Sequence, residues 1–373
     1  MGRGTQLIVS LLSLGCGLSH SATLNRETVD TLLNQLGADR APLAGDNVAW
    51  SVLPGPFYTP ELRLGMGAAI AGVYRVTPPD DTTTQNSAIS FTGFVSTSGA
   101  SGVGVHNYTF FAGDRWRLFV DGNIANIPTK FWGVGYDAAQ GTAQNYYDTS
   151  LRIHPQLLRQ LADHFYLGIG WDYSAQHARF DHPENGKSTL PNSSVSSGIT
   201  FSLNYDSRDV ITRPQQGQFF NMELRFFDPK MGADTRFSVT ELQYDVFFPL
   251  DARRVLALDT WGQFAHGDIP WNRLPQAGDD HRLRGYYPGR YRDNDVVSVQ
   301  IEYRQKMSWR HGIVLWAGMG AIGDKTQNLF HHPLLPTVGA GYRFEVKPDM
   351  NVRLDLGVGR DSAGFYFQVA EAF

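Results

Sequence analysis

The sequence predicts an all-β fold, a transmembrane antiparallel β-barrel of about sixteen strands. From residue 351 to the C-terminus apolar and polar residues alternate, so that Leu354 and Leu356 share one face of a strand while Arg353 and Asp355 share the other. The alternation runs to Phe373, and a closing strand that ends on an aromatic residue is typical of membrane barrels. Beyond the N-terminal segment no apolar run approaches the roughly 20 residues of a spanning helix. A chain that crosses a membrane in this way must close its strands into a barrel.

The composition agrees with a barrel whose outside is apolar and whose inside is polar. Hydrophobic residues make up 42% of the chain, an ordinary value, because the two faces of such strands cancel in any average. The 16 Tyr, 8 Trp and 23 Phe are the ring types that gather at the two membrane interfaces. A formal net charge of -4 without a basic stripe argues against nucleic acid as a partner.

The N-terminus predicts export. Arg3 is followed by an apolar core over residues 7–14 and by small residues up to Ala22, which predicts a signal peptide over residues 1–22. The only cysteine, Cys16, lies within it, so we expect a mature chain without disulfides. Ser13 stands where a lipidation motif has leucine, which favours simple cleavage over lipid attachment.

Residues 23–61 are expected to form a short helix and a linker. Asn25 can cap a helix that Gly37 ends, with Val29, Leu32, Leu33 and Leu36 on one face. Such a helix could plug the barrel, lie on the inner membrane leaflet, dock on a partner, or simply pack before the first strand. Four prolines between residues 38 and 60 indicate the linker.

Residues 62–373 are expected to be the barrel itself. The predicted lipid-facing rows are Phe165, Leu167, Ile169, Trp171 and Tyr173; Ile199, Phe201, Leu203 and Tyr205; Phe220, Met222, Leu224 and Phe226; Leu242, Tyr244 and Val246; and Val297, Val299, Ile301 and Tyr303. The intervening side chains are polar, as a wet interior requires: Thr200, Ser202, Asn204, Asp206, Asn221, Glu223 and Arg225. Single-chain barrels favour an even number of strands, which indicates sixteen.

Two long connections, over residues 177–194 and 267–294, are expected at the outer end of the barrel. The second is not an ordinary hydrophilic loop, because leucines and tyrosines are interleaved with Arg282, Arg284, Arg290 and Arg292. Such a mixture favours a loop that folds back against the protein.

Three motifs follow one another in the second half of the chain. Tyr205-Asp206-Ser207-Arg208-Asp209 precedes Pro214 and Gly217; Arg284-Gly285-Tyr286 lies in the second long connection; and a hairpin closes the chain through Phe365, Phe367, Val369 and Phe373. In this order they resemble the bacterial surface antigen barrels, the superfamily of BamA and TamA, which inserts or translocates proteins at the outer membrane. The resemblance implies an integral protein of the outer membrane of a Gram-negative bacterium.

The resemblance further implies that the long loop enters the lumen and that Arg284 pairs with acidic residues of the wall. Strand parity places Glu302 inside the barrel, within reach of that guanidinium. The family's second acidic partner would lie on the next strand, where this chain has Gly318, so we expect a weaker grip or one by Glu302 alone. On the closing strand, parity places Glu371 on the lipid-facing row, where an apolar residue is expected.

Other features separate the chain from its relatives. Between Thr23 and Leu62 there is no space for even one of the periplasmic POTRA domains that precede such barrels. No Gly-x-Ser-x-Gly elbow occurs, so we do not expect an enzyme. His331-His332 and Asp279-Asp280-His281 contain ligand types, but adjacent ligands in a polar loop are usually solvated, so we expect no metal and no cofactor.

Three functions remain open. The first, favoured by the resemblance, is movement or insertion of polypeptide or lipid at a seam between the first strand, placed at residues 62–76, and the last, at residues 364–373. The second is a passive pore or structural barrel, and the third is an interfacial lipid hydrolase. The expected partners are outer-membrane lipid and lipopolysaccharide, with a periplasmic protein or a substrate polypeptide as a further candidate.

Overall fold

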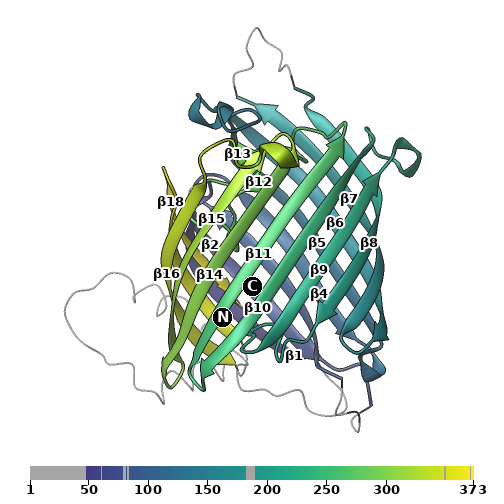
Figure 1. Ribbon diagram of the computed structural model, residues 1–373, viewed down its shortest axis with the longest axis vertical. Helices are drawn as coiled ribbons and strands as arrows, with labels where there is room; N and C mark the ends of the chain where they lie inside the picture. Colours follow the sequence, from purple (N-terminus) through teal and green to yellow (C-terminus); the bar gives the residue numbers. More distant parts are fainter. Residues whose placement is uncertain are drawn as a thin grey trace, which may run out of the picture.

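The computed structural model describes residues 48–373 except 60, 79–80, 82–83, 182–189, 348–349 and 370. Within these residues sixteen strands close into an antiparallel barrel, and two short strands form a separate hairpin (Figure 1). The predicted fold class is therefore confirmed. The predicted signal peptide and the helix expected after Asn25 lie outside the described residues.

The barrel wall consists of the following strands: β1 (Ala49–Thr59), β2 (Arg63–Tyr74), β3 (Ser87–Ser96), β4 (Ser101–Phe110), β5 (Trp116–Phe131), β6 (Gln144–Ala162), β7 (Phe165–Phe180), β8 (Ser193–Asp206), β9 (Gly217–Phe227), β10 (Phe237–Asp251), β11 (Arg254–Gly267), β14 (Asp295–Ser308), β15 (His311–Gly323), β16 (Leu335–Lys347), β17 (Met350–Val358) and β18 (Ala363–Val369). The hairpin consists of β12 (Gln276–Ala277) and β13 (Tyr291–Arg292). The helical turns are η1 (Ala112–Asp114), η2 (Ala138–Gln140), η4 (Pro229–Met231) and η5 (Thr326–Asn328). None of the helices in the described part of the chain has the length and apolar character needed to cross a membrane.

Each strand of the wall pairs with its neighbours in sequence, except that β11 pairs with β14 and β1 with β18. Antiparallel neighbours place successive connections at alternating ends of the barrel. The connections at 181–192 and 268–294 therefore share one end, the upper end in Figure 1, where β12 and β13 lie. Tight turns such as 252–253 and 309–310 lie at the other end.

Side chains sort between the two faces of the wall as the alternation predicted. On β7, Leu167 and Ile169 are each 50% exposed on the outer face. On β8, Thr200 is fully buried and Ser202 is 2% exposed on the inner face. The period-two pattern thus identifies the lumen-facing residues correctly on these strands.

Both ends of the predicted barrel need correction. The wall begins at Ala49, so residues 49–59, expected to be part of a linker, form the first strand β1. The prolines that suggested a linker are tolerated because β1 is paired fully on one side only, with β2. At the other end β18 ends at Val369, and Phe373 lies outside the closing strand.

Glu371 was also placed wrongly. It does not occupy the lipid-facing row; it is 8% exposed and bonds to Arg343 and Asn351 on the inner face of the wall. A charged side chain finds compensating partners inside the barrel that lipid cannot provide.

Candidate functional site

The connection between β11 and β14 leaves the upper rim and returns into the barrel. Its base is the hairpin of β12 and β13, and we call residues 278–290 between them the lumenal loop. Arg353, on the inner face of β17, donates to the Asp280 carbonyl at 2.8 Å, and Arg282 donates to Asp259 of β11 at 2.9 Å. Because these partners all lie on inner faces, the loop occupies the lumen.

Arg284 is the most completely enclosed side chain of the lumenal loop. Its Nη1 donates to Asp355 at 2.7 Å and its Nη2 donates to Glu302, and all three side chains are 0% exposed. The guanidinium carbon lies 3.7 Å from the ring centroid of Trp316, which adds a cation–π contact. Two charge-assisted hydrogen bonds and one aromatic face thus fix this side chain.

The second acidic partner is therefore not missing, and the expectation that Glu302 acts alone is wrong. Gly318 does stand where the family pattern has an acid, but Asp355 on β17 supplies the carboxylate. Parity placed Asp355 on the inner row of the closing hairpin, yet its distance from Glu302 across the sheet was not evident from the sequence. Trp316 on β15 pairs with Glu302 on β14. Its ring occupies the space that a side chain at Gly339 would need.

The pair of carboxylates is held in turn by other arginines. Arg304 donates to Glu302 at 3.0 Å, while Arg343 and Arg353 donate to Asp355 at 2.5 and 2.9 Å. Every charge in this lumenal network faces an opposite one. Such compensation is what makes buried charges tolerable, because an isolated one would carry the full desolvation cost.

The position after Arg284 requires glycine, both for its backbone conformation and for its close contact with β17. Its φ is +104°, a left-handed conformation, and a Cβ there would lie 2.7 Å from the backbone nitrogens of Val358 and Gly359. The Gly285 N–H donates to the Tyr366 hydroxyl at 2.8 Å, and the Ser362 hydroxyl donates to the Gly285 carbonyl at 2.5 Å. The loop backbone is thereby wedged against the β17–β18 hairpin.

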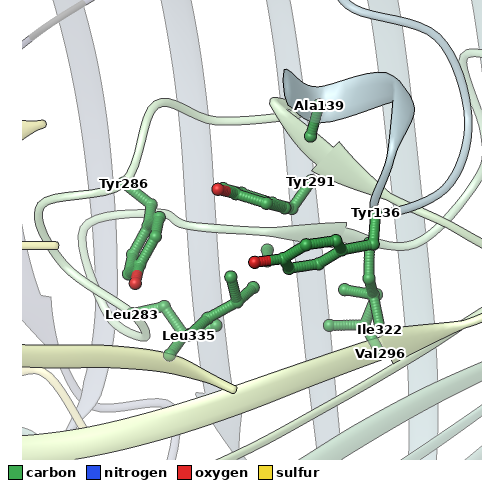
Figure 2. Packing of buried hydrophobic residues seen from close by; sticks show 9 residues of the cluster. Tyr136, Ala139, Leu283, Tyr286, Tyr291, Val296, Ile322 and Leu335 are labelled. Carbon is green, nitrogen blue, oxygen red and sulfur yellow. The ribbon is translucent and has the colours of Figure 1, made fainter. Parts of the chain in front are cut away.

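Tyr286 anchors the loop through packing. Figure 2 shows its ring near Tyr291 and Leu335, within a cluster that also contains Leu283. The other members of the cluster are Tyr136, Ala139, Ala277, Val296 and Ile322, from the neighbouring connection, the hairpin and the wall. The Tyr286 hydroxyl donates to the Pro336 carbonyl at 2.7 Å, which satisfies its polar end. All three residues of the motif are therefore structural contacts between the loop and the wall.

Comparison with known proteins agrees with this architecture. The model of the Omp85 superfamily domain matches residues 89–373. The chain belongs to the Omp85 superfamily. No protein of curated function matches it.

Solved structures of similar fold include BamA and CdiB proteins. BamA from Haemophilus ducreyi lacking POTRA domains 1–3 superposes with a TM-score of 0.54 at 12% identity, over 96% of this chain and 80% of that chain. CdiB from Escherichia coli gives 0.60 at 12% identity, over 91% and 68% of the two chains. CdiB from Acinetobacter baumannii gives 0.55 at 11% identity, over 86% of this chain and 59% of that chain.

Among the described residues, the two strands that close this Omp85 barrel, β1 and β18, share fewer paired residues than any other neighbours in the wall. β1 pairs with β2 from Ala49 to Thr59, whereas between β1 and β18 the described residues pair only at Tyr58 and Phe365. Pro54 and Pro56 lack an N–H and cannot donate to either neighbour. We call this boundary the seam. It lies one strand earlier than expected from the sequence, where residues 62–76 were taken as the first strand.

The motif Tyr205-Asp206-Ser207-Arg208-Asp209 lies at the end of the Omp85 barrel opposite the upper rim. Asp206 is 6% exposed and accepts hydrogen bonds from Arg208 at 2.8 Å and from Arg117 at 3.1 Å. Gly217, where β9 begins, has a φ of +101°. The motif therefore organises the connection between β8 and β9 and does not touch Arg284.

The clusters considered as metal sites have other partners. Asp279 accepts hydrogen bonds from the backbone N–H groups of His281 and Arg282. His332 stacks on Tyr136 with ring centroids 5.0 Å apart. Burial opposes ionisation of Asp280, but His281 and Arg353 hold the pKa of that carboxyl below its ordinary value. Among the described residues no three His, Cys, Asp or Glu side chains are grouped to hold a metal ion.

Proposed function

We propose that this chain is an integral outer-membrane barrel of a Gram-negative bacterium that inserts or moves polypeptide at the seam between β1 and β18. The observation that carries the proposal is the contrast between a lumen occupied by a pinned loop and a wall that is barely paired at one place. A solute would meet the loop, whereas a β-strand could pair with the open edge of β1. The chain resembles the BamA and TamA superfamily, which inserts or translocates proteins at the outer membrane, and this resemblance supports a role for the seam in insertion.

The partner that fits the seam is an extended polypeptide. An edge strand offers unpaired N–H and C=O groups, and a second strand satisfies them by addition to the sheet. The outer wall next to the seam carries Trp50 and Val52, which are 43% and 42% exposed. A guest strand with apolar residues on one face would match this wall, with outer-membrane lipid and lipopolysaccharide around it.

A passive pore is the alternative, and the lumenal loop argues against an open one. The loop is tied to the wall through Asp259, Glu302 and Asp355, so an open channel would require several buried ion pairs to break together. The hydrolase alternative has no observation in its favour, and we propose a non-enzymatic role without a cofactor.

Depletion of the protein in its native cell tests the proposal. We expect the abundance of other outer-membrane barrels, or the display of lipid A, to fall before growth stops. A matched strain that expresses the chain from a second locus should retain both. If depletion leaves both unchanged, a passive role replaces the proposed one.

A further inference from the structure

The outer face of the wall is hollowed over β11 and β14. A cavity of about 380 Å³, which we call the outer groove, runs there from the middle of the wall to the connection between β15 and β16 at the upper rim. In the wall, β14 is separated from β18 by β15, β16 and β17. The outer groove is therefore a feature separate from the seam.

Two neighbouring rows of paired residues on the outer face explain the hollow. In wall order, one row consists of Tyr244, Thr260, Val299 and Met319, and the next consists of Leu242, Gly262, Val297 and Ala321. Tyr244 and Met319, which are 38% and 47% exposed, form the sides. Between them β11 and β14 carry short side chains, and Gly262 carries none, so the floor of the groove stays open.

Two apolar side chains of the connection between β15 and β16 extend the outer groove to the upper rim. Phe330 is 72% exposed and Leu334 is 38% exposed, and both line the groove. Large apolar side chains on a connection are unfavourable in water and are stabilised where hydrocarbon covers them. The upper end of the groove therefore suits a lipid environment.

The floor of the outer groove offers no edge for a guest strand. β11 pairs along its whole length with β10, and its residues 254–264 also pair with β14. A guest strand needs free backbone N–H and C=O groups, whereas a hydrocarbon chain needs no hydrogen bonds. The occupant that fits an apolar groove in a lipid-facing sheet is therefore an acyl chain.

The polar residues at the upper end favour a phosphorylated lipid. Lys325 and His331, on the same connection as Phe330, are exposed. The one acid of this connection, Asp324, accepts a hydrogen bond from Asn328 at 2.7 Å. A cationic side chain above an apolar groove matches a lipid with a phosphate on its headgroup and acyl chains below it. Because the long connections of such barrels face outward, this end lies in the outer leaflet of the proposed outer membrane.

We propose that the outer groove binds an acyl chain of lipid A, the lipid anchor of lipopolysaccharide, and holds it more firmly than the rest of the outer wall holds lipid. The assignment to lipid A rests on the proposed outer-membrane location. It does not depend on insertion of polypeptide at the seam, and its test measures lipid contact alone.

Photolabelling tests the site on the folded protein. The barrel is reconstituted in phosphatidylcholine nanodiscs with lipid A that carries a diazirine on an acyl chain, and labelled peptides are identified by mass spectrometry. Peptides of β11 and β14 should carry at least fivefold more label than peptides of β3. Gly262→Leu and Val299→Phe each fill the groove, so each should reduce the label on β11 and β14 at least fivefold. Lys325→Gln should reduce it at least threefold.

Gly93→Leu is the matched control, because Gly93 shares the outer face of β3 with exposed Phe91 and Val95. A Cβ at Gly93 would meet its nearest atom at 3.9 Å, so the substitution fits without strain. It should leave the label on β11 and β14 unchanged. A Cβ at Gly262 would lie 2.9 Å from the ring of Phe264, so Val299→Phe provides a second variant that does not replace a glycine. Heat-dependent gel mobility verifies that each variant is folded.

A diazirine-bearing phosphatidylethanolamine, used in place of lipid A, tests the choice of lipid. It should label β11 and β14 no more than β3. The site is refuted if lipid A labels the outer wall evenly, or if folded Gly262→Leu and Val299→Phe both keep the label of the parent protein. The assignment to lipid A is refuted if phosphatidylethanolamine labels the groove as strongly, or if Lys325→Gln leaves the label unchanged.

Discussion

Arg284 donates a 2.7 Å hydrogen bond to Asp355, a carboxylate on β17 that lies three strands along the wall from its other partner, Glu302 on β14. One side chain of the lumenal loop therefore joins distant parts of the sheet. This link ties the position of the loop to the shape of the barrel near its seam, because β17 pairs directly with the last strand.

Arg284→Ala should destabilise the folded barrel by about 3–5 kcal/mol, because it leaves two buried carboxylates with fewer partners. The measurement is the loss of the fast-migrating folded form on gels with increasing denaturant. Asp121→Asn is the control, since its pair with His106 is exposed and should contribute little. Equal midpoints for the two variants would exclude a structural role for the Arg284 contacts.

Gly285→Ala should displace the loop, because an added Cβ meets backbone nitrogens that cannot move aside. We expect a cost of about 3 kcal/mol or more, from strained φ and overpacking together. Gly99→Ala separates the two effects: Gly99 also has a positive φ, +86°, but nothing lies within 4 Å of its added Cβ. A similar loss of stability in both variants would show that the close approach to β17 does not matter.

Trp316→Leu should weaken the hold on Arg284 by about 1–2 kcal/mol more than Trp316→Phe, because only phenylalanine keeps an aromatic face under the guanidinium. The same denaturation assay measures both variants. The difference should vanish in an Arg284→Ala background. If it persists there, ring packing rather than the cation–π contact explains it.

Deletion of residues 280–292 should raise the single-channel conductance in planar bilayers, because it removes the loop that fills the lumen. Lys230→Ala, on the connection between β9 and β10 at the same rim, should leave the conductance unchanged. A deletion variant that is folded and conducts like the parent protein would mean that the loop does not limit the pore.

Much of the barrel could be predicted because each strand faces two environments, and a period of two then identifies the lumen. In the structure Arg284 lies in the lumenal loop, and its partners Glu302 and Asp355 lie on β14 and β17. The pairing of Arg284 with Asp355 could not be derived, since it depends on how the loop crosses the lumen and on two intervening strands.

Two predictions, for residues 49–59 and for Glu371, were wrong because each relied on a local sequence pattern that the surrounding structure overrides. Pro54 and Pro56 argued against a strand, but β1 is paired fully on one side only, and there prolines are tolerated. Parity placed Glu371 toward lipid because it assumed that β18 continues to Phe373. Residues 371–373 instead lie in the lumen, where Arg343 and Asn351 donate hydrogen bonds to Glu371. No local pattern of the sequence reveals these partners.

The most direct test of the proposed function locks the seam. In a Cys16→Ser background, Tyr58→Cys with Phe365→Cys joins β1 to β18, while Tyr58→Cys with Leu64→Cys joins β1 to β2 at the same height. In depleted cells that rely on these variants, we predict that the β1–β18 disulfide stops accumulation of other outer-membrane barrels until a reductant is added, and that the β1–β2 disulfide does not. Normal accumulation with the seam fully crosslinked would contradict insertion at this boundary.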